Sequence, residues 1–454
     1  MDRKSTTFRK QPLWFRTLNS VWKNSYAFGT KIRIEKDDLI RAARKKTGLN
    51  DLGADFNEEP LEKLLYAINE EADLHAAGRF ITRERFVNLL TIRLRAEYYF
   101  KKYPEILDQE LYPAWIIIGL QRTGTTKLHR LLATDPDHRV IPSWEVINPV
   151  PVDLDYFQKM LSRQSSVSSQ QLETNSQHPK SNLQHPVSNI QYPISNDKRI
   201  SIAKTSVNAL KLMSPDFFAI HPIEIFEPEE DILLLDVSFL STTPEAITNV
   251  PSYAAWLENT DQSAAYAYYV KLLKFLQWVR PAKRWVLKTP HHLEFPDLIE
   301  KHFNEVYFLW PHRSIYESVP SFLSMVTYNQ MIFSNNVDTG SIARHWIRKT
   351  GYMLQKALEY RSRNDNQSKF IDIRYENLVT DSINELSRIY KMNGGLAEDQ
   401  ISRILQHEKE HPHQKHGVHK YALADFGLTE ADIDNYTKHY QDFFCHIDEK
   451  QKTE

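Results

Sequence analysis

The sequence lacks three features that would place it in a broad class of proteins. Cys445 is the only cysteine among 454 residues, so no disulfide can form within the chain, and a reducing cytoplasm is the expected location. No apolar run approaches the roughly 20 residues that a membrane-spanning helix requires. The charges nearly cancel, since 57 Lys+Arg face 58 Asp+Glu. No overall field therefore favours nucleic acid, and any site for an anion must be local.

The N-terminal segment also lacks the apolar stretch of roughly 7–15 residues that marks a signal peptide. It is basic and aromatic instead, with Lys, Arg, Phe and Trp spread over residues 3–23. Such a segment either contacts a membrane surface or lies on the domain that follows it. We expect the second arrangement, because the segment has no long apolar face.

Residues 36–102 have the spacing of amphipathic helices. Leucine and isoleucine recur at i, i+3, i+4 and i+7 between residues 61 and 68, which is one face of a helix. The helical region should end at Tyr103, because a residue that precedes proline disfavours the helical conformation. We therefore predict an N-terminal helical segment over residues 1–110.

The rest of the chain alternates between short apolar runs and helical patterns. Ala114–Gly119 is apolar and β-branched, as is typical of a buried strand in a parallel sheet. Four further strands are predicted at Ile232–Leu235, Trp285–Leu287, Val306–Trp310 and Phe370–Ile373. Helical patterns lie between them, for example over residues 264–278 and 342–360. This alternation predicts an α/β fold over residues 111–450, with a central parallel sheet between two layers of helices.

One segment interrupts this pattern. Residues 162–197 are rich in serine and glutamine, and a seven-residue unit recurs as QHPKSNL, QHPVSNI and QYPISND. A proline in every unit excludes a regular helix or a central strand. We predict a disordered low-complexity insertion that loops out of the sheet domain.

The first predicted strand leads into a sequence that resembles a phosphate-binding loop. Residues 115–130 read WIIIGLQRTGTTKLHR, with the glycine spacing of G-x-x-x-x-G-K-[ST], but Thr125 stands where the lysine belongs. The order of strand, turn and helix is the context that such a loop requires. Backbone N–H groups and the positive dipole at the helix start bind phosphate directly. Arg122 adds charge, and hydroxyl groups come from Thr123, Thr125 and Thr126. The alternative is an ordinary tight turn between strand and helix.

A second candidate site for an anion follows the predicted strand Val306–Trp310. Arg313 lies at the junction with the next helix, and Ser321 lies eight residues further on. The planar fork of an arginine side chain suits a phosphate group. In the alternative interpretation, Arg313 caps the helix or pairs with Glu317.

Lys288, His291 and His292 follow the predicted strand Trp285–Leu287. In an open α/β sheet, ligands bind beyond the carboxyl ends of the strands. We therefore expect the lysine and the two histidines to share one edge of the sheet with Arg122.

Together these segments resemble the sulfotransferases that use 3′-phosphoadenylyl sulfate (PAPS), and most closely the bacterial-type enzymes with an R-T-G-T-T loop. The similarity covers roughly residues 60–445, apart from the serine-rich segment. The segments that carry it are Pro113–Thr126, Trp144–Glu145, Lys288–Leu293, His312–Arg313 with Ser321, Arg374–Leu378 and His419–Leu428.

The resemblance implies that PAPS is the co-substrate and that no metal is required. Arg122 to Thr126, including Gly124, would bind the 5′-phosphosulfate, and Arg313 with Ser321 would bind the 3′-phosphate. Tyr375 would lie near the nucleotide, and Lys415 with His419 would belong to a loop that closes over the 3′-phosphate. A sulfuryl group carries less negative charge than a γ-phosphoryl group. The loop therefore needs no lysine at position 125.

The resemblance also implies the catalytic groups. Lys288 would stabilise the charge that builds on the leaving oxygen, and a histidine would accept the proton of the acceptor. His292 is favoured as this base, because the histidine of the family directly precedes a leucine, while His291 would orient the segment. The implied acceptor is a hydroxyl or amine of a small-molecule or lipid-like compound. The sequence leaves its identity open, and it is compatible with a homo-oligomer.

The alternative function is a P-loop kinase or NTPase with a degenerate Walker A loop. Its support is the predicted strand Ile232–Leu235, which is followed by Asp236 and mimics the Walker B strand that holds Mg²⁺. The missing loop lysine and the element formed by Arg313 and Ser321 argue against it. A non-catalytic nucleotide-binding protein is the third class, and Lys288 with its two histidines argues against that class.

Overall fold

The computed structural model of the chain describes residues 8, 11–25, 33–154, 197–411 and 421–453. The predicted insertion over residues 162–197 lies outside the described residues, apart from its last residue, Asp197. Lys415 and His419 also lie outside them.

The centre of the molecule is a five-stranded sheet in the order β2-β3-β1-β4-β5, and all of its neighbouring strands are parallel. The strands are β1 (Ala114–Ile117), β2 (His138–Arg139), β3 (Arg284–Lys288), β4 (Val306–His312) and β5 (Phe370–Arg374). Four of them confirm the predicted strands. The fifth, β2, was not predicted, because two residues are too few to show a pattern.

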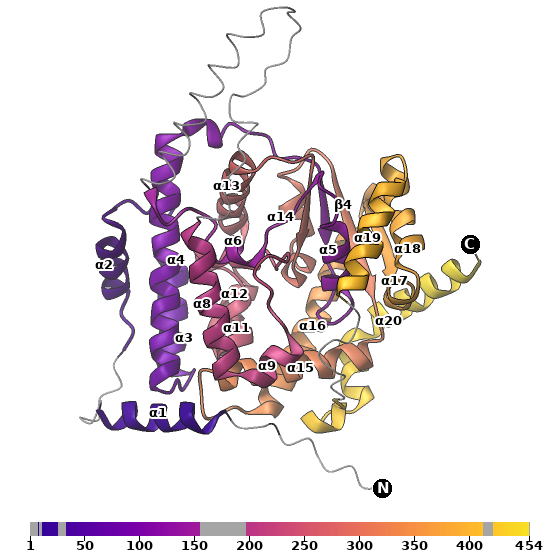
Figure 1. Cartoon of the computed structure of the whole chain (residues 1–454). Helices are drawn as coiled ribbons and strands as arrows, with labels where there is room; N and C mark the ends of the chain where they lie inside the picture. Colours follow the sequence, from indigo (N-terminus) through magenta and orange to yellow (C-terminus); the bar gives the residue numbers. More distant parts are fainter. Residues whose placement is uncertain (1–7, 9–10, 26–32, 155–196, 412–420, 454) are drawn as a thin grey trace, which may run out of the picture.

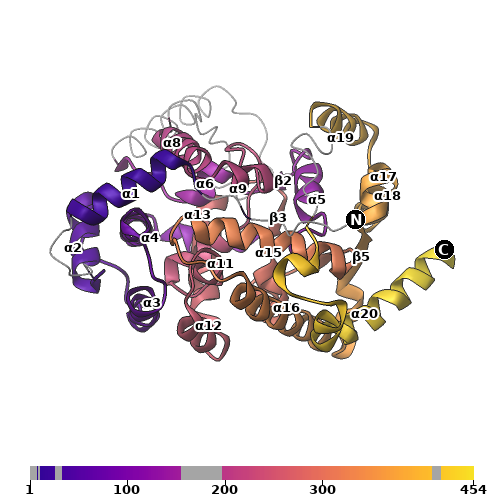
Figure 2. The ribbon, with the colours of Figure 1, turned by 90° about the horizontal axis from the view of Figure 1, so that it is seen from below.

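Helices cover both faces of this sheet, which confirms the predicted α/β fold. Along β1, Trp115 and Ile117 join one hydrophobic cluster, while Ala114 and Ile116 join the other. The first cluster includes residues of α5 (Thr125–Leu132), α18 (Ser382–Tyr390) and α19 (Glu398–Glu410). The second includes residues of α13 (Ser263–Val279), α15 (Ile315–Met331) and α16 (Thr339–Arg361). Figure 2 shows α5 and α19 on one side of the sheet and α15 and α16 on the other.

The N-terminal helices lie together at one side of the molecule (Figure 1). They are α1 (Leu13–Ser25), α2 (Lys36–Thr47), α3 (Glu59–Glu70) and α4 (Ala76–Lys102). The predicted end of the helical region is confirmed, since Tyr103 caps α4. Buried residues of α2, α3 and α4 belong to the same hydrophobic cluster as residues of the sheet. The boundary near residue 110 stays a prediction.

The predicted strand at Ile232–Leu235 is wrong, because these four residues form the helix α10. A short buried apolar run fits a strand and a helix equally well, so the pattern alone could not decide. Asp236 follows the helix and is buried. Its carboxylate pairs with Arg85 at 2.5 Å and accepts a hydrogen bond from the hydroxyl of Ser241. The Walker B interpretation therefore fails, since this aspartate lies on no strand and already has protein partners.

The remaining helices complete the two outer layers. They include α6 (Ser143–Ile147), α8 (Lys198–Met213), α9 (Pro215–Ile220), α11 (Thr243–Ile247), α12 (Pro251–Glu258), α14 (Pro296–Glu300), α17 (Tyr375–Thr380) and α20 (Glu430–Thr453). Among the helices of the described residues, none combines the length and the hydrophobicity needed to cross a bilayer. The predicted cytoplasmic location stays a prediction.

Candidate active site

The loop between β1 and α5 has the shape of an anion-binding turn. Arg122 and Gly124 both adopt left-handed backbone conformations, with φ of 69° and 92°. At Gly119, an added Cβ would lie 2.9 Å from both Thr123 Oγ1 and Thr125 Cγ2. The glycine therefore lets the loop fold back on the helix start. Gly124 is the N-cap of α5, so free backbone N–H groups follow it into the first turn.

The threonines of the loop have different roles. The Thr123 hydroxyl is buried and donates a hydrogen bond to the carbonyl of Leu120 at 2.7 Å. Its proton therefore holds the turn together and is not free for a ligand. Thr125 is buried as well, whereas Thr126 is exposed at the helix start.

The predicted parts of the nucleotide site come together around Arg122. Its Nε donates to Ser321 Oγ at 3.0 Å, and the Arg313 guanidinium donates to its carbonyl at 3.1 Å. Arg313 also lies over the ring of Tyr375, 4.2 Å from the ring centroid. That ring packs against the loop, since a Cβ on Gly124 would lie 2.9 Å from Tyr375 Cδ2. Residues from three separate segments thus form one array at the carboxyl edge of the sheet.

Arg122 has only neutral hydrogen-bond partners among the described residues. Besides Ser321, it donates to the carbonyl of Ile220 at 3.2 Å. Burial lowers the pKa of Arg122, and the nearby Arg313 lowers it further. An arginine nevertheless stays charged at neutral pH, so the array contains a positive charge that is paired with no carboxylate of the described residues. Arg313 differs, because it pairs with Glu317 at 2.7 Å, as the alternative interpretation of the sequence expected.

Lys288 lies at the end of β3 and is buried. Its ammonium group donates to Glu230 Oε1 at 2.9 Å. Asp231 binds the backbone of the same residue, because its Oδ2 accepts from Lys288 N and its own N–H donates to the Lys288 carbonyl, both at 3.2 Å. The acidic run before α10 is therefore attached to the strand end that carries the lysine.

The two predicted histidines lie behind Lys288 and are fully enclosed. His292 has an exposed fraction of 0% and His291 of 1%. His292 Nδ1 is 2.8 Å from the hydroxyl of Tyr266. Its Nε2 lies 3.2 Å from Asp231 Oδ1 without the geometry of a hydrogen bond. Burial, followed by the nearby His292 and Lys349, holds the pKa of His291 well below its ordinary value.

A buried ionic cluster lies next to His291. Lys349 contacts both carboxylate oxygens of Glu294, at 3.0 and 3.1 Å. Burial raises the pKa of Glu294 to about 7, although Lys349 opposes this shift. His291 Nδ1 lies 3.3 Å from the hydroxyl of Thr242, which gives the histidine a second neighbour on this inner side.

A third histidine near the loop was not predicted. His221 directly follows α9, and its side chain is partly exposed. Burial lowers its pKa, while Glu229 and Glu230 raise it and Lys288 and Arg122 lower it. The sequence held no local signal for this residue, because only the tertiary fold brings the end of α9 to the loop.

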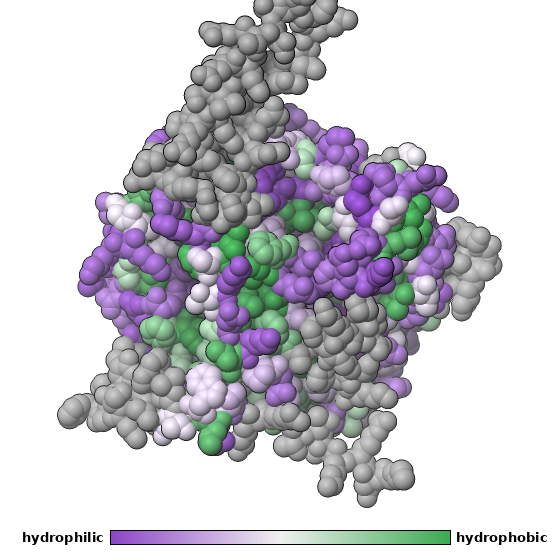
Figure 3. Space-filling model, viewed as in Figure 1, coloured by the Kyte–Doolittle hydropathy of each residue, from purple (hydrophilic) through white to green (hydrophobic). Residues whose placement is uncertain are grey.

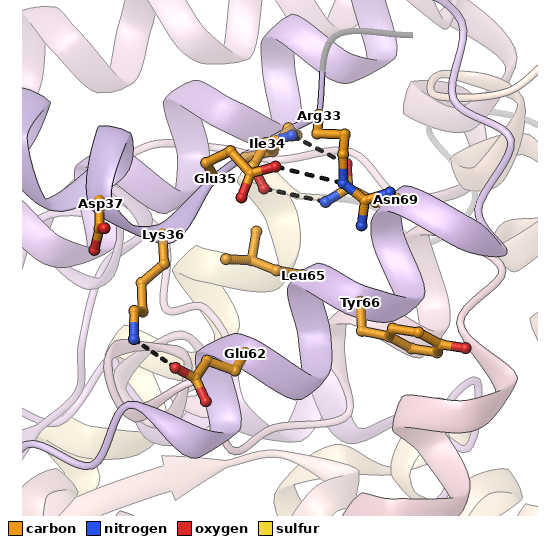
Figure 4. A pocket seen from close by; sticks show the side chains of 9 residues that line it. All are labelled: Arg33, Ile34, Glu35, Lys36, Asp37, Glu62, Leu65, Tyr66 and Asn69. Carbon is orange, nitrogen blue, oxygen red and sulfur yellow. Dashed lines mark hydrogen bonds and ion pairs between the residues drawn. The ribbon is translucent and has the colours of Figure 1, made fainter.

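A pocket of about 330 Å³ lies elsewhere, between the start of α2 and α3 (Figure 4). Its two basic side chains are paired with carboxylates. Lys36 pairs with Glu58 and Glu62, and Arg33 pairs with Glu70 at 2.5 Å. None of the residues predicted to bind a nucleotide lines it.

The parallel sheet, the glycine-capped turn and the uncompensated Arg122 define an α/β protein with a P-loop-like anion site. The chain matches the model of the sulfotransferase family over residues 113–399. It belongs to that family, so the resemblance seen in the sequence is confirmed at this level.

Two solved structures are similar to this fold. One is sulfotransferase STF1 from Mycobacterium tuberculosis H37Rv, with 26% identity, a TM-score of 0.70, and coverage of 90% of this chain and 99% of that chain. The other is sulfotransferase STF9 from Mycobacterium avium, with 22% identity, a TM-score of 0.70, and coverage of 91% and 98%. No curated protein sequence matches the chain significantly.

Proposed function

We propose that this sulfotransferase takes the sulfuryl group from PAPS and transfers it to a hydroxyl or amine of a small-molecule or lipid-like acceptor. The observation that carries the proposal is the array around Arg122. A partly buried guanidinium with only neutral partners among the described residues favours an anion, since burying an unpaired charge is costly. Arg313 and Ser321, both in contact with Arg122, extend the array toward a second anionic group.

In this proposal, the loop binds the 5′-phosphosulfate through Arg122, Thr125, Thr126 and the backbone N–H groups after Gly124. Arg313 and Ser321 bind the 3′-phosphate, which distinguishes PAPS from ATP. Tyr375 offers the face of its ring beside them. Thr123 contributes by holding the turn, because its hydroxyl is bonded to Leu120. Lys415 and His419 remain part of the proposal as a closing loop.

The transfer is direct and passes through a loose, in-line transition state of the phosphoryl-transfer type. The acceptor oxygen or nitrogen bonds to sulfur while the bond from sulfur to the bridging oxygen breaks. Lys288 stabilises the charge on that oxygen. This interaction accelerates the reaction because it is strongest in the transition state. The lysine is now bound to Glu230, so it must turn from this carboxylate toward the donor.

A histidine acts as the general base. The sequence offers His292, with His291 as the alternative, and both lie next to the end of β3. Their burial means that an acceptor reaches either ring only after side chains such as Tyr266 move aside.

The face of the molecule that carries α8 suits an acceptor with an apolar part. Apolar colour gathers at the centre of the face seen in Figure 3. Large apolar side chains are exposed along α8 and after α9: Ile202 at 40%, Leu212 at 64% and Phe226 at 58%. An alcohol or phenol attached to a hydrophobic body would bury such side chains.

Calorimetry with adenosine 3′,5′-bisphosphate and with AMP tests the donor site. We expect selective binding of the bisphosphate, because only this nucleotide carries the 3′-phosphate that Arg313 and Ser321 would bind. Transfer of ³⁵S from labelled PAPS, and no transfer of ³²P from ATP, tests the reaction. Equal affinity for the two nucleotides would refute the assignment of the 3′-phosphate site.

A further inference from the structure

His221 lies at the end of α9, next to the loop that holds Arg122. Its backbone N–H donates to the Phe217 carbonyl at 2.8 Å, which ends α9. The preceding carbonyl, that of Ile220, accepts a hydrogen bond from Arg122 at 3.2 Å. A single hydrogen bond therefore joins the residue before His221 to the centre of the donor array.

The side chain of His221 is half-buried, and neither ring nitrogen has a hydrogen-bond partner within the ranges that the structure describes. Its ring neighbour is Phe217, at 5.8 Å between centroids. A polar ring that is half-buried beside a charged array and bound to nothing suggests a partner that arrives with the substrate.

The charges that act on His221 are those of the proposed reaction centre. They come from Glu229 and Glu230 before α10, Lys288 at the end of β3 and Arg122 in the loop. The pKa of Glu229 responds to the same groups: burial raises it, but His221, Lys288, the Glu230 backbone N–H and His129 lower it, and the pKa falls below its ordinary value. His221 thus belongs electrostatically to the group around Lys288.

Three other histidines of the described residues lie close to the loop or to the end of β3, and all three are enclosed. His292 and His291 are 0% and 1% exposed. His129, on α5, is also buried, with its Nε2 3.2 Å from the carbonyl of Val286, and burial lowers its pKa to about 3. Among these histidines, only His221 is partly exposed, and the residue before it binds Arg122 through its carbonyl.

We propose that His221 is the general base that accepts the proton of the acceptor. The inference rests on the proposed sulfotransferase function. As the acceptor oxygen bonds to sulfur, its proton passes to a ring nitrogen of His221. The bond between sulfur and the bridging oxygen breaks, and adenosine 3′,5′-bisphosphate leaves with that electron pair. His292 then has a positioning role, since its Nε2 faces the carboxylate of Asp231, which binds the backbone of Lys288.

The environment of His221 suits a base. Its lowered pKa keeps the ring neutral at pH 7, when a nitrogen lone pair is needed. The dominant cause is burial, and the positive charges of Lys288 and Arg122 act in the same direction. The anionic donor would raise this pKa when it binds. The pKa obtained from the pH dependence of kcat should therefore lie above the pKa obtained from the pH dependence of kcat/KM for PAPS.

The experiment uses water as the acceptor, because no other acceptor has to be known. Release of [³⁵S]sulfate from PAPS is measured in single turnovers from pH 5 to 9 for the wild type, His221→Gln, His292→Gln and His302→Gln. His302 is the matched control, because it is another partly exposed histidine whose pKa burial lowers, and it lies after α14. Thermal melts and calorimetry with adenosine 3′,5′-bisphosphate show that each variant is folded and binds nucleotide.

We expect His221→Gln to release sulfate about 10²–10⁴-fold more slowly and to lose the rise of rate with pH that the wild type and His302→Gln retain. Its nucleotide affinity should be unchanged. A wild-type rate and pH profile in His221→Gln would overturn the proposal, as would loss of the pH dependence in His292→Gln alone. Nucleotide binding by the wild type without any release of sulfate would also overturn it. A wild type that neither binds the nucleotide nor releases sulfate would instead refute the proposed function.

Discussion

Gly124→Ala tests whether the conformation of the loop determines nucleotide binding. Gly124 has φ 92° and ψ 3°, a left-handed conformation that costs an alanine about 1–2 kcal/mol. In addition, the new Cβ would lie 2.9 Å from Tyr375 Cδ2 and 3.4 Å from Cε2. The first distance is too short for a carbon–carbon contact, so either the tyrosine or the loop must move.

The expected magnitude follows from what Tyr375 contacts. Its ring lies under the Arg313 guanidinium, 4.2 Å from the ring centroid, so a displaced ring disturbs the proposed 3′-phosphate site as well. If the loop relaxes away from its binding conformation, the strain of about 1–2 kcal/mol reappears as a loss of binding free energy. This corresponds to roughly 5- to 30-fold weaker binding of adenosine 3′,5′-bisphosphate.

Gly394→Ala is the matched control. Gly394 has φ 88° and ψ 5°, but an added Cβ would meet nothing within 4 Å. This variant has the same backbone strain without the contact, so its nucleotide affinity should equal that of the wild type. Calorimetry gives the affinities, and thermal melts report the stability of both variants. If Gly124→Ala binds the nucleotide as tightly as Gly394→Ala, the coupling between the loop and Tyr375 does not exist.

Three further predictions concern charge. Arg313→Ala should weaken binding of adenosine 3′,5′-bisphosphate by about 1.5–3 kcal/mol and leave the affinity for AMP unchanged in calorimetry; equal losses for both nucleotides would contradict its role. Sulfuryl transfer should continue in excess EDTA, because the proposed site neutralises the donor with backbone N–H groups and Arg122; abolished turnover would contradict this part of the proposal. The pKa of Glu294 is raised above its ordinary 4.5 to about 7 in the folded protein. The protonated carboxyl group therefore stabilises the folded state fully below pH 4.5, and this contribution is lost as the pH rises through 7. Urea unfolding between pH 4.5 and 8 should therefore show a weaker loss of stability in Glu294→Gln than in the wild type, and identical slopes would refute this assignment.

Much of the site was predictable, because its parts follow strands with a clear apolar pattern. The end of β1 leads into the loop, β3 leads to Lys288, and β4 leads to Arg313. Since the strands of a doubly covered sheet are parallel, their carboxyl ends meet at one edge. The Arg313 guanidinium, after β4, reaches the Arg122 carbonyl, after β1, as expected for two neighbouring parallel strands.

The rest depends on tertiary structure that no local pattern contains. Ile232–Leu235 was assigned to a strand, but packing of its leucines in the core selects a helix. No sequence pattern marks His221, because only the tertiary fold places the end of α9 next to the loop. The enclosure of His292 was equally invisible, since a strand-end histidine can face either the ligand or the core.

Arg122 makes three hydrogen bonds to other segments. Its guanidinium donates to Ser321 on α15 and to the carbonyl of Ile220 on α9, and its own carbonyl accepts from Arg313. The loop, the end of α9 and the start of α15 cannot fluctuate independently while these contacts exist. We expect them to open together as one unit of local unfolding, because opening at one element breaks its contact with the others. A nucleotide that bridges Arg122 and Arg313 would hold this unit shut, so the acceptor side would become ordered when the donor binds. In the proposed reaction, we therefore expect the donor nucleotide to bind before the acceptor and the spent nucleotide to leave last.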